Sequence, residues 1–214
     1  MIKCCIFDLD GVLVDTAKYH YQAWKSIADE MGFDFTEEDN ERLKGVSRMA
    51  SLDILLSIGK ITLTESEKQE KAAVKNSRYL EYILKMTPAE VLPGVSDFLQ
   101  TLHEKGILIA LGSASKNART ILKQVGLESF FDAIADGNNV THAKPDPEVF
   151  LKAACLAETP VDECIVFEDA VAGIEAAHRA RMRCVGVGDP AVLAAADFHI
   201  RDFTNQDVLF SLIG

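Results

Sequence analysis

The sequence predicts an α/β protein with a parallel-sheet core and an inserted helical segment. Four short apolar runs have the length and composition of buried parallel strands: residues 2–7, 107–111, 164–167 and 183–187. Four helical patterns lie between or after these runs: residues 95–104, 117–125, 147–157 and 172–180. The alternation of strand and helix indicates a Rossmann-like sheet with right-handed crossovers.

One long segment interrupts this alternation. Residues 16–86 are rich in Lys, Glu and Gln and contain no buried-strand run, so they read as successive helices. Thr87-Pro88 closes the segment, and Pro93-Gly94 marks a turn before the next helix of the core. We therefore expect an α/β catalytic core domain made of residues 1–15 and 87–214, with a helical cap domain at 16–86.

Composition and charge limit the classes of partner. The 214 residues are 48% hydrophobic and 26% charged, which is a globular balance, and the net charge is −11. That charge argues against nucleic acid or an anionic membrane as a partner. No stretch resembles a signal peptide or a spanning helix, and we expect a soluble, cytoplasmic monomer. The five cysteines contain no C-x-x-C pair and are expected to be reduced core residues.

Two carboxylates follow the first predicted strand. Asp8 and Asp10 are two residues apart, so in extended chain they point to the same face, and Gly11 permits a sharp turn directly after them. One carboxylate can attack as a nucleophile while the other transfers protons, and a divalent cation would relieve their repulsion. Asp at a strand end can also simply cap the next segment.

Polar groups also end two later strands and precede one helix. Ser113 can hold a phosphate oxygen, although this loop taken alone favours a simpler interpretation in which Ser115 caps the next helix. Lys144 can neutralise a phosphoryl group or lie solvated beside a helix start. Glu168 and Asp169 suit a hard cation, or one of them can cap a helix. Because ligands of open α/β sheets bind at the carboxyl ends of strands, the four signals together favour one phosphoryl-transfer site.

These motifs resemble those of the haloacid dehalogenase superfamily over the whole chain. The matching segments are Asp8-Leu9-Asp10-Gly11-Val12, Ser113, Lys144-Pro145 and Glu168-Asp169. The resemblance implies that Asp8 forms an aspartyl-phosphate, that Asp10 is the general acid/base, and that Ser113 and Lys144 steady the transferring group. It further implies a Mg²⁺ ion held by Asp8, the backbone carbonyl of Asp10, Glu168 and Asp169.

The predicted cap is similar to that of the β-phosphoglucomutase family. His20 and Trp24 lie one turn apart on a helix, although Trp24 also fits a core position and His20 a surface one. Arg48 can clamp a second phosphate or be an exposed residue at a helix start. The candidate substrate-binding residues are His20, Trp24, Lys44, Gly45, Val46, Ser47, Arg48, Lys75, Ser113, Ala114, Ser115, Lys116 and Asn117.

The resemblance implies an isomerase that converts β-glucose 1-phosphate to glucose 6-phosphate through phospho-Asp8 and a 1,6-bisphosphate. The alternatives are a sugar-phosphate phosphatase of the same superfamily, or a phosphonatase that uses Lys75 as its Schiff-base lysine. A protein of a different class, a catalytically inactive binding module, would be expected to lack at least one of the motif residues, and all are present.

Overall fold

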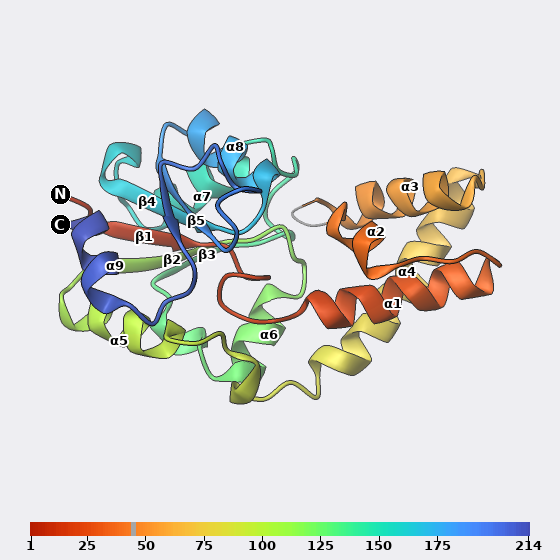
Figure 1. The fold of residues 1–214 in the computed structure, drawn as a ribbon, viewed down its shortest axis with the longest axis horizontal. Helices are drawn as coiled ribbons and strands as arrows, with labels where there is room; N and C mark the ends of the chain where they lie inside the picture. Colours follow the sequence, from red (N-terminus) through yellow and green to blue (C-terminus); the bar gives the residue numbers. More distant parts are fainter. Residues whose placement is uncertain (44–45) are drawn as a thin grey trace.

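The core of the computed structural model, which describes residues 1–43 and 46–214, is a six-stranded parallel sheet (Figure 1). Its strand order is β3-β2-β1-β4-β5-β6, so the direction of winding reverses between β1 and β4. The strands are β1 (Cys4–Phe7), β2 (Leu108–Gly112), β3 (Ala133–Ala135), β4 (Cys164–Glu168), β5 (Arg183–Val187) and β6 (Phe198–Ile200). The predicted α/β fold with a parallel sheet is therefore confirmed.

Helices cover both faces of the sheet. One face packs on α5 (Val95–Glu104), α6 (Ala118–Val125) and α9 (Gln206–Ile213), whose apolar residues share a buried cluster with Phe7 and Phe167. The Phe7 and Phe167 rings stack 4.8 Å apart. The other face packs on α7 (Glu148–Leu156) and α8 (Val171–Arg179). Since both faces are buried, the central strands can consist of unbroken apolar runs.

Four further helices stand apart from the sheet at one end of the molecule (Figure 1). They are α1 (Ala17–Glu30), α2 (Glu37–Glu41), α3 (Arg48–Gly59) and α4 (Glu65–Ile83), and they enclose a core of their own. Local capping explains where three of them begin, because the side chains of Thr36, Ser47 and Thr64 accept hydrogen bonds from the first turns of α2, α3 and α4. The interruption predicted for this part of the chain is helical throughout its described elements.

The structure corrects several details of the prediction. The short strands β3 and β6 and the terminal helix α9 were not predicted. The seventh helix begins at Glu148 rather than at Pro147, which is the residue directly before it. The short 3-10 turns Pro88–Glu90, Glu128–Phe130 and Val161–Glu163 complete the connections. Four of the five free cysteines are buried, but Cys155 is exposed on α7, so the expectation that all are core residues was wrong for it.

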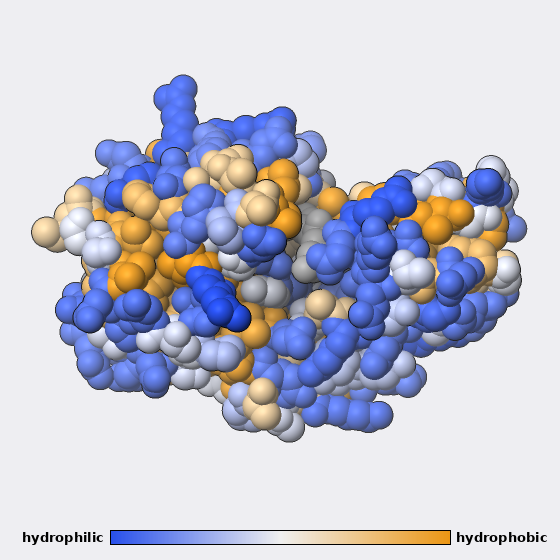
Figure 2. Space-filling view, viewed as in Figure 1, coloured by the Kyte–Doolittle hydropathy of each residue, from blue (hydrophilic) through white to orange (hydrophobic). Residues whose placement is uncertain are grey.

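The surface is largely polar. Figure 2 shows hydrophilic side chains over most of one face, with apolar side chains gathered near α9 and along part of α3. This agrees with the net charge of −11. Within the described ranges, every helix is too short or too polar to cross a bilayer.

Candidate active site

The site forms where the sheet reverses its winding, because β1 and β4 are neighbours there. Phe7 pairs in register with Phe167, so the residues that follow, Asp8 and Glu168, lie side by side at the carboxyl edge. The Asp8 backbone N–H donates to the Phe167 carbonyl at 3.0 Å and holds this register. The topology thus brings together two acids that are 160 positions apart in the sequence.

Lys144 joins these two carboxylates. Its Nζ donates to Asp8 Oδ1 at 2.6 Å and to Glu168 Oε2 at 2.8 Å. The Lys144 side chain is only 1% exposed, so the interpretation of Lys144 as a solvated lysine is wrong. Burial acts to lower the pKa of Lys144, but the carboxylates of Asp8 and Glu168 outweigh it and raise this pKa above its ordinary value. Lys144 is therefore a permanent cation inside the site.

Three acids of the site could share one cation. Oxygen atoms of Asp8, Glu168 and Asp169 lie within 4.8 Å of one another. Burial, and the nearby charge of Asp8, raise the pKa of Glu168, while Lys144 acts against this shift. Carboxylate oxygens are the donors that hard divalent cations prefer, so the donor set fits a divalent metal ion.

Two glycines allow this acidic cluster to form. A Cβ on Gly11 would lie 2.1 Å from Asp169 Oδ2, and a Cβ on Gly173 would lie 2.0 Å from Glu168 Cδ. Gly11 also has φ +80°, which disfavours any other residue there. The glycines therefore determine where both carboxylates of the last motif can lie.

Asp10 lies beside Asp8 in the same cavity, on the side of the helical segment. The hydroxyl of Thr16 donates to Asp10 Oδ1, and His20 Nε2 lies 4.0 Å from the same oxygen. Removal from bulk water, together with the charge of Asp8, raises the pKa of Asp10 to about 6. A carboxyl group with such a pKa can both accept and return a proton near neutral pH.

The loop after β2 is held by its own serines. Ser113 is fully buried, and its Oγ accepts from the Ser115 N–H at 3.1 Å. Ser115 Oγ in turn accepts from the N–H of Asn117, the residue directly before α6. Ser115 therefore stabilises the turn before the helix rather than occupying the cap position itself. The Asn117 side chain donates to Asn76 of α4 at 3.0 Å, which links the core to the helical segment.

The helical segment contributes a cationic and aromatic wall. Lys75 Nζ lies 2.9 Å from His20 Nδ1 and stands over the rings of Trp24 and Tyr79, at 4.9 and 4.5 Å from their centroids. Trp24 is 1% exposed, which fits the core position, and it also borders the cavity, so its contact with a substrate stays a prediction. Burial lowers the pKa of His20 well below its ordinary value, and Lys75 and Arg48 lower it further.

These groups surround one cavity of about 470 Å³, which suits a small ligand. Of the predicted residues, Glu168 lies fully buried behind Asp8, outside the lining. Lys44 and Gly45 lie outside the described residues. All other candidates border the cavity: Asp8, Asp10, His20, Trp24, Val46, Ser47, Arg48, Lys75, Ser113, Ala114, Ser115, Lys116, Asn117, Lys144 and Asp169.

Sequence reasoning missed Tyr79 and Glu148. Tyr79 lines the cavity one helical turn after Lys75, and this spacing could have indicated it. The Glu148 carboxylate accepts from the backbone N–H of Thr141 at 3.0 Å and of His142 at 2.6 Å, which ties down the loop that carries Lys144. These bonds hold the pKa of Glu148 at about 2. No local pattern marks this role.

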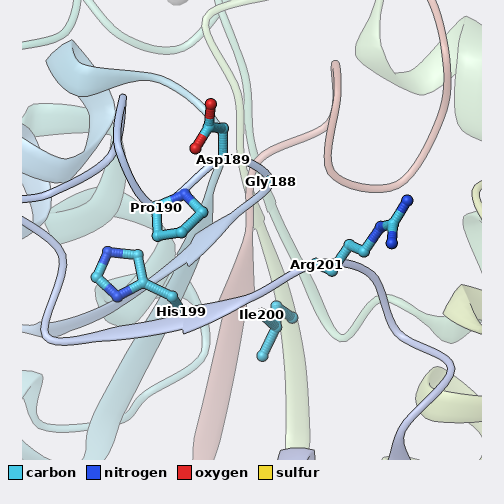
Figure 3. A pocket seen from close by; sticks show the side chains of 6 residues that line it. All are labelled: Gly188, Asp189, Pro190, His199, Ile200 and Arg201. Carbon is cyan, nitrogen blue, oxygen red and sulfur yellow. The ribbon is translucent and has the colours of Figure 1, made fainter.

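A second hollow lies at the far end of the sheet, between the ends of β5 and β6 (Figure 3). In that view Arg201 points away from His199 and Asp189. The Asp189 carboxylate accepts from the Ala191 N–H at 2.8 Å, and His199 Nε2 bonds the Leu193 carbonyl at 2.9 Å. These polar groups stabilise the local loops, and no predicted site residue lines this hollow.

The chain is similar to known proteins over most of its length. A sequence model of haloacid dehalogenase-like hydrolases matches residues 2–181. β-Phosphoglucomutase of Bacillus subtilis is 43% identical over 202 residues, which cover 94% of this chain and 89% of that protein. A phosphorylated carbohydrates phosphatase of Thermotoga maritima is 30% identical over 84% of this chain and 82% of that protein. The crystal structure of β-phosphoglucomutase from Clostridium difficile superposes with a TM-score of 0.94 at 40% identity, covering 99% and 96% of the two chains.

Proposed function

We propose that this chain, which belongs to the haloacid dehalogenase-like hydrolase family, is a β-phosphoglucomutase that interconverts β-D-glucose 1-phosphate and β-D-glucose 6-phosphate. The observation that carries the proposal is that charged residues of both the sheet and the helical segment line one cavity. The sheet contributes Asp8, Asp10 and Lys144, and the helical segment contributes Arg48 and Lys75. A phosphatase needs only the first group of residues, whereas a substrate with two phosphates, such as the bisphosphate intermediate, uses both groups.

Asp8 is the proposed nucleophile. One of its oxygens is held by Lys144, which leaves the carboxylate oriented toward the cavity that it lines. Attack on phosphorus forms an aspartyl-phosphate and releases the sugar oxygen. Lys144 and the Ser113 hydroxyl would neutralise and hydrogen-bond the phosphoryl oxygens as the group transfers.

Asp10 is the proposed general acid/base. Its raised pKa of about 6 lets it take the proton from the sugar 6-hydroxyl that attacks phospho-Asp8. The product is β-glucose 1,6-bisphosphate, which turns so that its other phosphate faces Asp8. Asp10 then returns the proton to the leaving sugar oxygen, and Thr16 keeps its carboxyl group in place.

A divalent metal ion is expected in this family, and we propose that it is Mg²⁺. Asp8, Glu168, Asp169 and the backbone carbonyl of Asp10 would hold it, which agrees with the clustered carboxylate oxygens. When bound, Mg²⁺ would offset the negative charge of the phosphoryl group and of the acids around it.

The helical segment is proposed to act as the cap domain, residues 16–86, over a core of residues 1–15 and 87–214. Arg48 lies in the first turn of α3, where Ser47 caps the helix, and would bind the phosphate remote from Asp8. His20, Trp24, Val46, Lys75 and the Ala114–Asn117 loop would contact the sugar phosphate. Lys44 and Gly45 are also proposed to bind the substrate. The enzyme is proposed to act as a monomer.

A sugar-phosphate phosphatase is the competing function, since a relative named as a phosphatase is 30% identical. Replacing Arg48 with Ala separates the two. Loss of a charge-assisted phosphate contact should lower mutase turnover about 100-fold, while hydrolysis of p-nitrophenyl phosphate is retained. Arg42→Ala is the matched control, because that side chain is 57% exposed. If Arg48→Ala leaves mutase turnover unchanged, the proposal is wrong.

The Asp8→Asn substitution tests the alternative that the protein is a catalytically inactive binding module. This substitution removes the nucleophile with little change in shape and should abolish both activities. If both activities persist in Asp8→Asn, Asp8 is not the nucleophile. If the unmodified protein shows neither activity with Mg²⁺, the inactive module is correct.

A further inference from the structure

A second group of metal-ligating side chains lies on the loop that carries Lys144 and at the start of α7. His142, Asp146 and Glu148 each offer one ligand atom, and these atoms lie within 4.8 Å of one another. None of the three belongs to the acidic cluster around Asp8, and the proposed phosphoryl transfer assigns none of them a contact with the substrate. Their arrangement therefore needs an explanation of its own.

Two of these ligand atoms already have the spacing that a metal ion requires. His142 Nδ1 lies 2.9 Å from Glu148 Oε2. A zinc ion about 2.1 Å from each of two ligand atoms, with an angle of about 90–110° between them, places those atoms about 3.0–3.4 Å apart. An ion can therefore take the place of the hydrogen bond between them, and the two atoms need to separate by only about 0.5 Å or less.

The local backbone holds the two carboxylates in place. The Glu148 carboxylate accepts from the backbone N–H groups of Thr141 and His142, and also from the Thr141 hydroxyl at 2.9 Å. Asp146 Oδ1 accepts from the Glu148 N–H at 2.9 Å, which keeps this acid beside the other two ligands. Groups that orient metal ligands in this way raise the affinity of a site, because less freedom is lost when the ion binds.

The site is open to solvent and has a mixed set of donor atoms. The His142 side chain is 69% exposed and that of Glu148 is 29% exposed, so an ion can enter without any rearrangement of the core. An imidazole nitrogen beside carboxylates suits Zn²⁺ and similar transition-metal ions, whereas oxygen ligands alone suit Mg²⁺. This site and the acidic cluster around Asp8 therefore differ in the ion that each prefers.

We propose that His142, Asp146 and Glu148 form a second metal site, which binds a divalent transition-metal ion of the Zn²⁺ type. Three protein ligands leave the remaining coordination position to water. His142 precedes Lys144 by two residues and Asp146 follows it by two. A bound ion would therefore join the two flanks of Lys144 and restrict the loop that presents it to Asp8.

Metal titration of the full chain tests this proposal. The protein is freed of metal with a chelator, saturated with Mg²⁺, and titrated at pH 7.5 with Zn²⁺ by calorimetry and with Co²⁺ by visible absorption. We expect one Zn²⁺ per chain to bind in the presence of Mg²⁺, and a Co²⁺ absorption band that Zn²⁺ removes. The proposal is overturned if no Zn²⁺ binds under these conditions.

Three variants locate the bound ion. His142→Gln and Asp146→Asn each remove one ligand with little change in size, and each should lower the affinity for Zn²⁺ at least tenfold. His178→Gln is the matched control, because the His178 imidazole also lies beside a carboxylate, that of Asp197 at 3.1 Å, but belongs to no such group of three in the described part of the chain. Unchanged affinity in both ligand variants, or an equal loss in the control, would overturn the proposal. If one ligand variant fails to fold, the other decides.

Asp169→Asn separates the second site from the acidic cluster around Asp8. It should weaken the binding of Mg²⁺ and leave the binding of Zn²⁺ unchanged. If instead Asp169→Asn lowers the affinity for Zn²⁺ and His142→Gln does not, zinc binds the acidic cluster and the proposal is wrong. Because binding is measured without a substrate, these results do not depend on whether the chain proves to be a mutase.

Discussion

Replacing Gly173 with Ala should displace Glu168 and so disrupt the acidic cluster. The new Cβ would lie 2.0 Å from Glu168 Cδ and 2.1 Å from Oε2, closer than any real Cβ contact. Glu168 is fully buried and hydrogen-bonds Lys144 at 2.8 Å and the Ala170 N–H at 3.1 Å, so moving it breaks these bonds. At an ordinary helix position Gly→Ala would instead stabilise the protein by about 1 kcal/mol.

The magnitude follows from those contacts. Overpacking costs about 1–3 kcal/mol, and each hydrogen bond to a charged group contributes about 1.5–3 kcal/mol. After the helical gain of Ala is subtracted, Gly173→Ala should lower the free energy of unfolding by about 4 kcal/mol. For a chain of this length that corresponds to a fall in Tm of about 10 °C.

Thermal unfolding and Mg²⁺ titration, both by calorimetry, measure the stability and the metal affinity of the Gly173→Ala protein. A second substitution, Glu168→Asp, tests whether the loss comes from the clash with Glu168. Shortening the acid by one methylene makes room for the methyl group that Gly173→Ala adds, so the double variant should lose about 0.5–3 kcal/mol less than the sum of the single variants. A Gly173→Ala protein that is more stable than wild type and has unchanged metal affinity would show that Gly173 does not determine the position of Glu168.

Three further predictions concern the same centre. Lys144→Met leaves the buried carboxylates of Asp8 and Glu168 without their cation, so it should lower the free energy of unfolding by about 3–5 kcal/mol at pH 8. The loss should be smaller at pH 6, where Glu168 takes up a proton. Urea unfolding at the two pH values measures both losses, and equal losses would contradict the prediction. Because burial raises the pKa of Glu168, metal binding should release a proton, and metal affinity should increase as the pH rises from 6 to 8. Calorimetry in two buffers of different ionisation enthalpy measures the proton release. If no proton is released, Glu168 is already ionised before the metal binds. Glu148→Ala leaves the Thr141 N–H without its acceptor, so the loop that carries Lys144 becomes less fixed and kcat should fall at least tenfold. Glu148→Asp should retain part of the lost kcat. Steady-state kinetics of both variants tests this, and an unchanged kcat in Glu148→Ala would contradict it.

The fold could be predicted where the local pattern was strong. Four apolar runs bounded by acids, Gly or Ser correspond to β1, β2, β4 and β5. The strands β3 and β6 have only three residues each, and His199 at the centre of β6 breaks its apolar pattern. They form because neighbouring strands supply backbone partners, which is information that lies outside their own sequence.

The site residues likewise fall into those that a local pattern predicts and those that depend on distant parts of the chain. Asp8, Asp10 and Ser113 could be predicted, since each lies within three residues after a strand and strand ends meet at one edge. The burial of Lys144 could not, because it depends on two carboxylates from distant strands. The roles of Gly173 and Glu148 likewise depend on contacts between elements.

In the proposed mechanism, the phosphoryl group passes from Asp8 to a sugar hydroxyl in preference to water. Phosphorus NMR can follow β-glucose 1-phosphate incubated with the protein, Mg²⁺ and a trace of glucose 1,6-bisphosphate. We expect glucose 6-phosphate to accumulate faster than inorganic phosphate. Release of inorganic phosphate in step with substrate loss, without glucose 6-phosphate, would contradict it.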